Sequence, residues 1–88
     1  MKVVFRSSFV SDLKSIQDKA LLQRVRQIIE SVEQASSLAV ISNFKKLKGQ
    51  GNYSRIRVGS YRIGIVFESE NVTFVRFLDR KDIYKYFP

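Results

Sequence analysis

The sequence predicts a single α+β domain, residues 1–88, in which a helical hairpin covers one face of a small sheet. Two stretches in the first half of the chain carry apolar residues at helical spacing. Three runs with strand-like alternation follow in the second half. The predicted order of elements is therefore β-α-α-β-β-β, closed by a short helix or turn. Because two helices can cover only one face of the sheet, the other face is expected to stay open.

The first half of the chain contains one strand and two helices. Residues 2–6 form a short apolar run with β-branched content, which predicts the first strand. Ser7 and Ser8 offer a cap for a first helix, and Asp18 offers one for a second. The expected stripe of the first helix is Phe9, Leu13, Ile16 and Ala20; that of the second is Leu21 or Leu22, Val25, Ile28 or Ile29, and Val32. Residues 35–51 are expected to form a connection with room for one helical turn.

The second half contains three strands, at about 53–58, 61–68 and 72–78, and a terminal helix or turn over 79–87. In the first of these strands Arg55 and Arg57 alternate with apolar residues, so both point to one face. Gly59-Ser60 then breaks the run, and a tight hairpin there would add Arg62 to the same surface. Like charges placed this close repel one another. An anion is the simplest reason to gather them.

The charge of the chain is concentrated in the same region. The formal net charge is +8, and residues 45–62 contain six basic residues and no acidic one: Lys45, Lys46, Lys48, Arg55, Arg57 and Arg62. A localised basic field favours a nucleic acid, an acidic protein or an anionic membrane. No apolar run approaches the ~20 residues that span a bilayer, and residues 3–5 are too few for a signal peptide. We therefore expect no membrane partner.

Two residue types are missing, and their absence narrows the chemistry. The chain has no cysteine and no histidine. Disulfides, thiol nucleophiles, Ser-His-Asp triads and ordinary zinc sites are excluded, and neither a metal nor another cofactor is expected. The lack of cysteine is compatible with a reducing cytoplasm, the expected location. Arg, Lys, Tyr, Asp, Glu, Ser and Thr remain to do any chemistry.

Three blocks of the sequence, residues 46–49, 53–63 and 79–84, resemble in that order the blocks of the RelE/ParE toxin superfamily. The resemblance covers essentially the whole chain. It implies a small twisted antiparallel sheet with helices on one face and a basic cleft on the other. RelE-type members are toxins of type II toxin–antitoxin systems. They act as ribosome-dependent endoribonucleases (mRNA interferases) that cut mRNA in the A site, with contacts to 16S rRNA, until an acidic antitoxin inactivates them.

The resemblance also implies roles for individual residues. Arg55 and Arg57 take the places of two basic residues on the first hairpin strand, and Arg62 that of the arginine that clamps the scissile phosphate. Arg80 and Tyr84 take the places of the arginine and tyrosine in the last block. The lysines of the basic stretch are expected to bind RNA: Lys45, Lys46 and Lys48.

The resemblance does not settle which residue is the general base and which is the general acid. Asp79 stands where many relatives carry histidine, and an arginine effectively never deprotonates. Tyr84 is the most plausible proton-transfer group. Two alternatives remain open: a ParE-like toxin that inhibits DNA gyrase and cuts nothing, or a relative that has lost activity, with Asp79 as the sign of that loss. The presence of both Arg80 and Tyr84 favours the nuclease.

Overall fold

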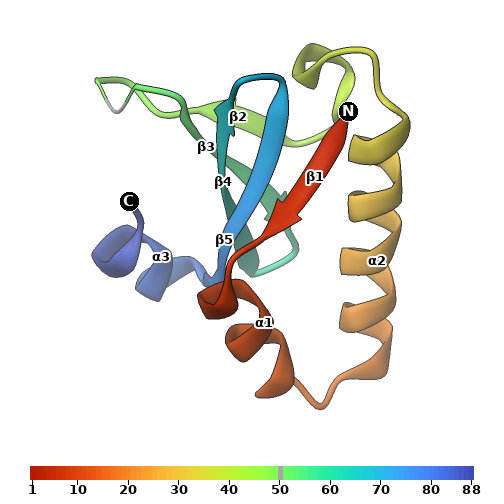
Figure 1. Cartoon of the computed structure of the whole chain (residues 1–88). Coiled ribbons are helices and arrows are strands. Elements are labelled where there is room, and N and C mark those ends of the chain that lie inside the picture. The colour runs from red at the N-terminus through yellow and green to blue at the C-terminus, as the bar shows by residue number, and fades with distance from the viewer. Residues whose placement is uncertain (50) are drawn as a thin grey trace.

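The computed structural model describes residues 1–49 and 51–88, which form a five-stranded sheet with three α-helices (Figure 1). The elements in chain order are β1 (Lys2–Phe5), α1 (Ser7–Lys14), α2 (Lys19–Gln34), a 3₁₀ turn η1 (Leu38–Val40), β2 (Phe44–Lys46), β3 (Tyr53–Val58), β4 (Tyr61–Glu68), β5 (Asn71–Asp79) and α3 (Arg80–Tyr86). The predicted α+β class and the order of the predicted elements are confirmed. None of the helices described is long and apolar enough to cross a membrane.

The sheet is mixed, with the strand order β1-β5-β4-β3-β2. Neighbours from β2 to β5 pair antiparallel, whereas β1 pairs parallel to β5, with Phe5 opposite Phe74. The expectation of a wholly antiparallel sheet is therefore wrong at this edge. The helices carry the chain from β1 to the far edge of the sheet, and three reversals then bring β5 back alongside β1 in the same direction.

Strand β2 lies inside the segment that the sequence indicated as a connection. It places Lys45 opposite Arg55 and Lys46 opposite Ser54, so these two lysines point to opposite faces of the sheet. Phe44 packs against the core from this edge. A strand of three residues is too short for its alternation to be recognised in the sequence.

The two predicted helix caps have different outcomes. Asp18 caps α2, and its carboxylate accepts a hydrogen bond from the backbone N–H of Leu21 at 3.1 Å. The prediction of a serine cap for α1 is wrong, because the cap position is Arg6 and no side chain bonds there. The first helix also ends at Lys14, so Ala20 belongs to α2, where it is exposed.

The residues of α1 instead satisfy the backbone of β5 beyond the end of the short strand β1. The hydroxyl of Ser8 donates to the carbonyl of Val75 at 2.6 Å. The Asp12 carboxylate accepts from the backbone N–H of Phe77 at 2.9 Å and binds the Arg76 guanidinium at 2.8 Å. These contacts close an edge that would otherwise present unpaired backbone groups.

The two faces of the sheet carry different layers, as Figure 1 shows, with α2 on one side of the strands and α3 on the other. Phe9 of α1 and Val25 and Val32 of α2 are buried against the main core of the sheet. On the opposite face, Ile83 and Phe87 form a smaller cluster with Val66 and Val75. The predicted helical layer is confirmed, and α3 covers part of the face that was expected to be open.

Candidate functional site

The hairpin of β3 and β4 brings the predicted arginines together on the face that also carries α3. Arg57 lies directly opposite Arg62, and Arg55 lies opposite Gly64. Lys45 of β2 is the neighbour of Arg55 on its other side. In an antiparallel pair directly opposite residues point to the same face, at Cβ separations of about 5 Å. The alternation that buries Ile56 and Val58 therefore aligns four cations on the other face.

These cations line a pocket of about 250 Å³, which we call the arginine pocket; its lining residues are Asn43, Lys45, Arg55, Arg57, Arg62 and Tyr84. The lining contains no acidic side chain. Both ion pairs of the described residues, Arg26–Glu30 and Arg76–Asp12, lie outside it. A small pocket with several unpaired cations is suited to an anion of the size and charge of a phosphate group.

Two of the arginines are held by hydrogen bonds of the hairpin and its neighbour. Nη1 of Arg62 donates to the carbonyls of Gly59 at 3.0 Å and of Tyr61 at 2.9 Å. Nη2 of Arg57 donates to Oδ1 of Asn43 at 3.2 Å. Each guanidinium has five N–H donors, so both retain donors for a ligand. These bonds orient Arg57 and Arg62 in the absence of a ligand.

Tyr84 reaches the same pocket from α3. The Arg55 guanidinium lies over its ring at 4.7 Å from the centroid, a cation–π contact. The ring stays 59% exposed, so a ligand can reach the phenol. Arg55 lowers the pKa of Tyr84 below its ordinary value, Arg80 adds to the effect, and partial desolvation opposes it. The phenolate is thus easier to form here than in an isolated tyrosine.

Arg80 and Asp79 lie at the start of α3. The Asp79 carboxylate caps the helix by accepting from the backbone N–H of Lys81 at 2.8 Å, which gives this aspartate a structural role. The backbone N–H of Arg80 donates to the backbone carbonyl of Ser60 at 2.9 Å and connects the helix to the β3–β4 turn. Arg80 lines an adjoining hollow rather than the arginine pocket itself, and Tyr84 lines both.

The position of Tyr84 depends on how the end of α3 sits on the sheet. The ring of Phe87 is buried directly over Gly64, where a Cβ atom would meet ring carbons at 2.7 Å. Tyr53 packs edge-on against the same ring, with centroids 5.4 Å apart. Glycine at position 64 leaves room for this ring, and the ring in turn fixes the helix that carries the phenol.

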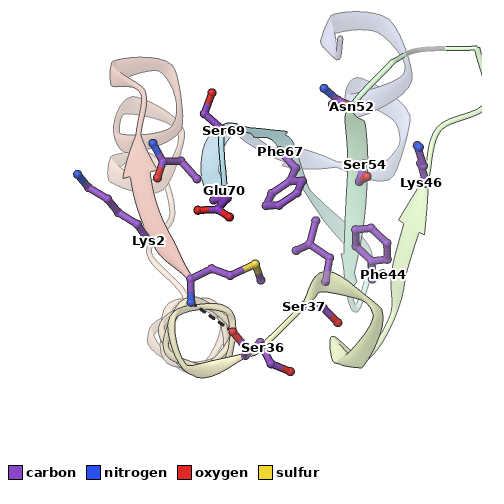
Figure 2. Close-up of a pocket in the computed structure, with 14 residues that line it drawn as sticks. Lys2, Ser36, Ser37, Phe44, Lys46, Asn52, Ser54, Phe67, Ser69 and Glu70 are labelled. Atoms are coloured by element: carbon purple, nitrogen blue, oxygen red, sulfur yellow. Dashed lines mark hydrogen bonds between the residues drawn. The ribbon is translucent and has the colours of Figure 1, made fainter.

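The remaining predicted RNA-binding residues lie elsewhere. Lys46 lines a cavity of about 790 Å³ on the opposite side of the sheet. In Figure 2 Phe44 and Phe67 point into this cavity, whereas Lys2 and Lys46 extend away from it. Lys48 follows β2 in an exposed turn. Of the three lysines, Lys45 alone lines the arginine pocket.

Asn43 borders the arginine pocket and was not among the predicted site residues. Its backbone has φ of 63°, in the left-handed region, and its backbone carbonyl accepts a hydrogen bond from the backbone N–H of Arg57 at 3.1 Å. Asparagine tolerates this conformation better than most residues, so an Asn just before a basic stretch is a usable signal for such a turn. No cluster of acidic side chains suited to a metal ion occurs in residues 1–49 and 51–88.

Comparison with known proteins identifies the family. Residues 3–84 match the family model described as the ParE toxin of the type II toxin–antitoxin system parDE. The chain belongs to this toxin family. The chain is also 46% identical to Toxin RelE3 of Methanocaldococcus jannaschii, with both chains covered completely. Membership of the RelE/ParE superfamily, predicted from the three sequence blocks, is confirmed.

Solved structures of toxins share the fold of this family member. The RelB-RelE antitoxin-toxin complex from Methanococcus jannaschii matches with a TM-score of 0.83 and 44% identity, covering 97% of this chain and 99% of the other. The archaeal RelE-RelB complex from Pyrococcus horikoshii OT3 matches with a TM-score of 0.72 and 22% identity, covering 90% and 93%. The second likeness concerns the fold alone.

Proposed function

We propose that this toxin is a ribosome-dependent endoribonuclease that cleaves mRNA by attack of a 2′-hydroxyl on its own 3′-phosphate. The observation that carries the proposal is the arginine pocket, which joins several unpaired cations to a phenol of lowered pKa. The similarity to Toxin RelE3 supports the same activity. Translating ribosomes lie in the cytoplasm, so the proposal places the toxin there.

The reaction requires a base for the 2′-hydroxyl, an acid for the 5′ leaving oxygen, and cations for the charge that grows on phosphorus. We assign Arg62 to the phosphate, which Arg80 approaches from the adjoining hollow that Tyr84 also lines. Arg55 and Arg57 are assigned to the developing charge. Lys45 binds the RNA beside them. Lys46 and Lys48 lie outside the pocket, so we assign them to flanking RNA or to 16S rRNA rather than to the cut.

Tyr84 is the proton-transfer group in this proposal. Arg55 lies against its ring, and the lowered pKa of the phenol brings its anion closer to neutral pH. The remaining catalytic power comes from the ribosome, which holds the mRNA in the A site. Orientation of that kind is worth roughly 7–11 kcal/mol of the barrier. A site with no histidine can therefore work when its substrate is already ordered.

The deciding experiment is to induce the toxin and map mRNA 5′ ends, with and without ongoing translation. New ends confined to translated regions, and lost when initiation is blocked, are the expected result. Intact mRNA in growth-arrested cells would refute the nuclease. The Arg62→Ala variant serves as a control for cleavage by host enzymes.

A second candidate function is inhibition of DNA gyrase by binding, without cleavage. The match to the family model of the ParE toxin favours it. In that case the arginine face contacts a protein, and Tyr84 has no proton to move. Broken DNA or arrested replication with intact mRNA would select this function over the nuclease.

We also propose that an acidic antitoxin inactivates the toxin by covering the arginine face or displacing α3. Both the net charge of +8 and the RelB-RelE complexes among the structural matches support such a partner. Binding should weaken with salt, because exposed charges are screened beyond ~10 Å at 0.1 M. Co-expression with a small acidic protein encoded beside the toxin gene should yield a complex; a locus without such a gene, or recovery of free toxin alone, would count against it.

A further inference from the structure

A second pocket, of about 450 Å³, lies beside the arginine pocket and has no role in the reaction described above. It is formed between α2 and the segment that leads into β2, and we call it the α2 pocket. Its polar lining includes Arg24, Gln27, Ser31, Gln34, Asn43 and Arg57. Asn43 and Arg57 also line the arginine pocket, so the two pockets adjoin along these side chains.

The polar residues on this side of α2 form one stripe. Arg24, Gln27, Ser31 and Gln34 recur three or four residues apart, the spacing of a single helix face. The acidic residues of the helix, Glu30 and Glu33, lie on another side, where both line a separate hollow with Arg26. The charged residues that line the α2 pocket are thus two arginines, Arg24 and Arg57, with no acidic residue beside them, which favours an anionic ligand.

Arg24 connects this stripe to the arginine pocket. Its Nη1 lies 3.3 Å from the point that a Cβ atom on Gly59 would occupy, so the side chain crosses from α2 to the β3–β4 turn. The carbonyl of the same Gly59 accepts the hydrogen bond from Arg62. Arg24 and Arg62 therefore approach one turn from different elements, and Arg57 lines both pockets, so the positive surface continues from one pocket into the next.

The other lining groups suit a nucleotide. Amides of glutamine and asparagine can bind the polar edges of an unpaired base or a 2′-hydroxyl. Val40, which is 65% exposed, offers an apolar surface to the face of a base. The volume lies within the range of small-ligand pockets. A basic groove that follows the backbone beside surfaces for bases is how proteins bind single strands.

From these observations we propose that the α2 pocket binds the nucleotide next to the cleaved linkage, with Arg24 on its phosphate. This inference rests on the proposed nuclease function. The strand held in the arginine pocket continues past Arg57 and Asn43 onto the polar stripe of α2. The α2 pocket is a binding subsite, so its loss affects KM and leaves kcat nearly unchanged.

The test compares Arg24→Gln with Arg26→Gln in steady-state cleavage on ribosomes programmed with synthetic mRNA, which measures KM and kcat separately. Both variants remove one charge from the exposed surface of the same helix, and the Arg26–Glu30 pair contributes little, as exposed pairs do. In the mRNA each linkage beside the cut is replaced in turn by an uncharged methylphosphonate. For the parent, one neutral linkage should raise KM about tenfold, as the loss of one charge-assisted hydrogen bond does.

The Arg24→Gln variant should show the same rise in KM on unmodified mRNA. The neutral linkage that raises the KM of the parent should raise that of Arg24→Gln no further. Arg26→Gln should behave as the parent in both experiments. Equal kinetics of the two variants on unmodified mRNA would overturn the subsite. A weaker Arg24→Gln that keeps the full methylphosphonate effect would place Arg24 on ribosomal RNA and also overturn it. If the parent itself cleaves no mRNA, the proposed function fails, and the subsite with it.

Discussion

The two faces of the sheet are built from alternate residues of the same strands, yet they serve different purposes. On the side of α1 and α2, side chains such as Ile56, Ile63 and Phe74 are fully buried in one continuous core. On the other side, the smaller cluster around Phe87 lies beside four cations that share no acidic partner. The two faces therefore differ in role. The face with α1 and α2 stabilises the fold, whereas the face with α3 holds like charges close together, which costs stability.

This difference explains how the side chains of the site can have few packing contacts and still have a fixed backbone. The cations lie on strands whose opposite sides are fixed by the core, so their backbone positions do not depend on contacts within the site. Tyr84 is the exception. It lies on α3, which is held to the sheet mainly by Ile83 and Phe87. We expect the core face to respond to mutation through stability and the arginine face through activity.

The largest effect is expected from Phe74→Ala on the core face. Phe74 is fully buried and packs against the rings of Phe5 and Phe9 in tilted contacts, at centroid distances of 5.4 and 5.3 Å. Truncation of such a ring costs about 3–5 kcal/mol, a large share of the stability of a small domain. Urea unfolding measures it, with the exposed Tyr86→Ala as the control. A loss below about 1 kcal/mol would mean that this face does not carry the fold.

Tyr84→Phe should have the largest effect on the opposite face. The change keeps the ring over which Arg55 lies and removes only the hydroxyl. A proton-transfer role predicts a fall of roughly 10²–10⁴ in single-turnover cleavage, with an unchanged melting temperature. If Tyr84 instead stacks on a base, Phe retains the parental rate and Ala does not. That outcome would remove Tyr84 from the chemistry and leave the ribosome to supply the proton transfer.

Arg62→Ala should reduce the rate by about 10²–10³ if Arg62 binds the phosphate in the transition state, as proposed. Its hydrogen bonds to the Gly59 and Tyr61 carbonyls contribute about 0.5–1.5 kcal/mol each, so the folded protein should survive the change. Growth inhibition at matched expression and urea unfolding should be measured together. Growth arrest as strong as the parent's would show that Arg62 does not hold the phosphate.

Features that depend on nearby residues could be predicted from the sequence, whereas features that depend on distant residues could not. Alternation identified the face of Arg55 and Arg57 because the buried partners Ile56 and Val58 are unambiguous. The Asp18 cap was equally readable, since its effect is local. By contrast, the parallel pairing of β1 with β5 joins residues about 70 positions apart, and no local pattern encodes such a pairing.

The site was predicted in part for related reasons. The arginines could be placed together from one hairpin, whereas the contact between Tyr84 and Arg55 required the docking of α3, which Gly64 and Phe87 decide. Lys46 was grouped with Lys45 because both belong to one basic run. The short strand β2 separates them onto opposite faces. A charge count along the sequence does not contain that information.

Gly64→Ala is expected to have a smaller effect on activity, through the contact between β4 and Phe87 at the end of α3. The added methyl group would overlap the Phe87 ring at 2.7 Å, and that ring belongs to a segment outside the sheet, so the ring and α3 should move rather than the strand. Overpacking of this kind costs about 1–3 kcal/mol. Cleavage should fall while the sheet remains folded, as amide exchange of β3 and β4 can show. Parental cleavage would mean that Phe87 does not position Tyr84.

The smallest effect is a shift in the pH profile, which can identify what Tyr84 does. If the phenolate acts as a base, the rate rises with pH and levels off above the pKa of Tyr84; if the phenol acts as an acid, the rate falls above that pKa. Arg55 is the main group that lowers the pKa of Tyr84. Its removal in Arg55→Gln should therefore move the bend to higher pH in either case.

The control for this shift is Arg57→Gln, which removes the same charge from the same pocket, whereas the groups that chiefly lower the pKa of Tyr84 are Arg55 and Arg80. Both variants should lower the overall rate, because each loses a cation that stabilises developing charge, so the position of the bend is the quantity to compare. Only Arg55→Gln should move it, and Tyr84→Phe should abolish it. A bend that stays in place in Arg55→Gln, or moves equally in Arg57→Gln, would belong to another group. In that case the cation–π pair positions the ring without setting its protonation.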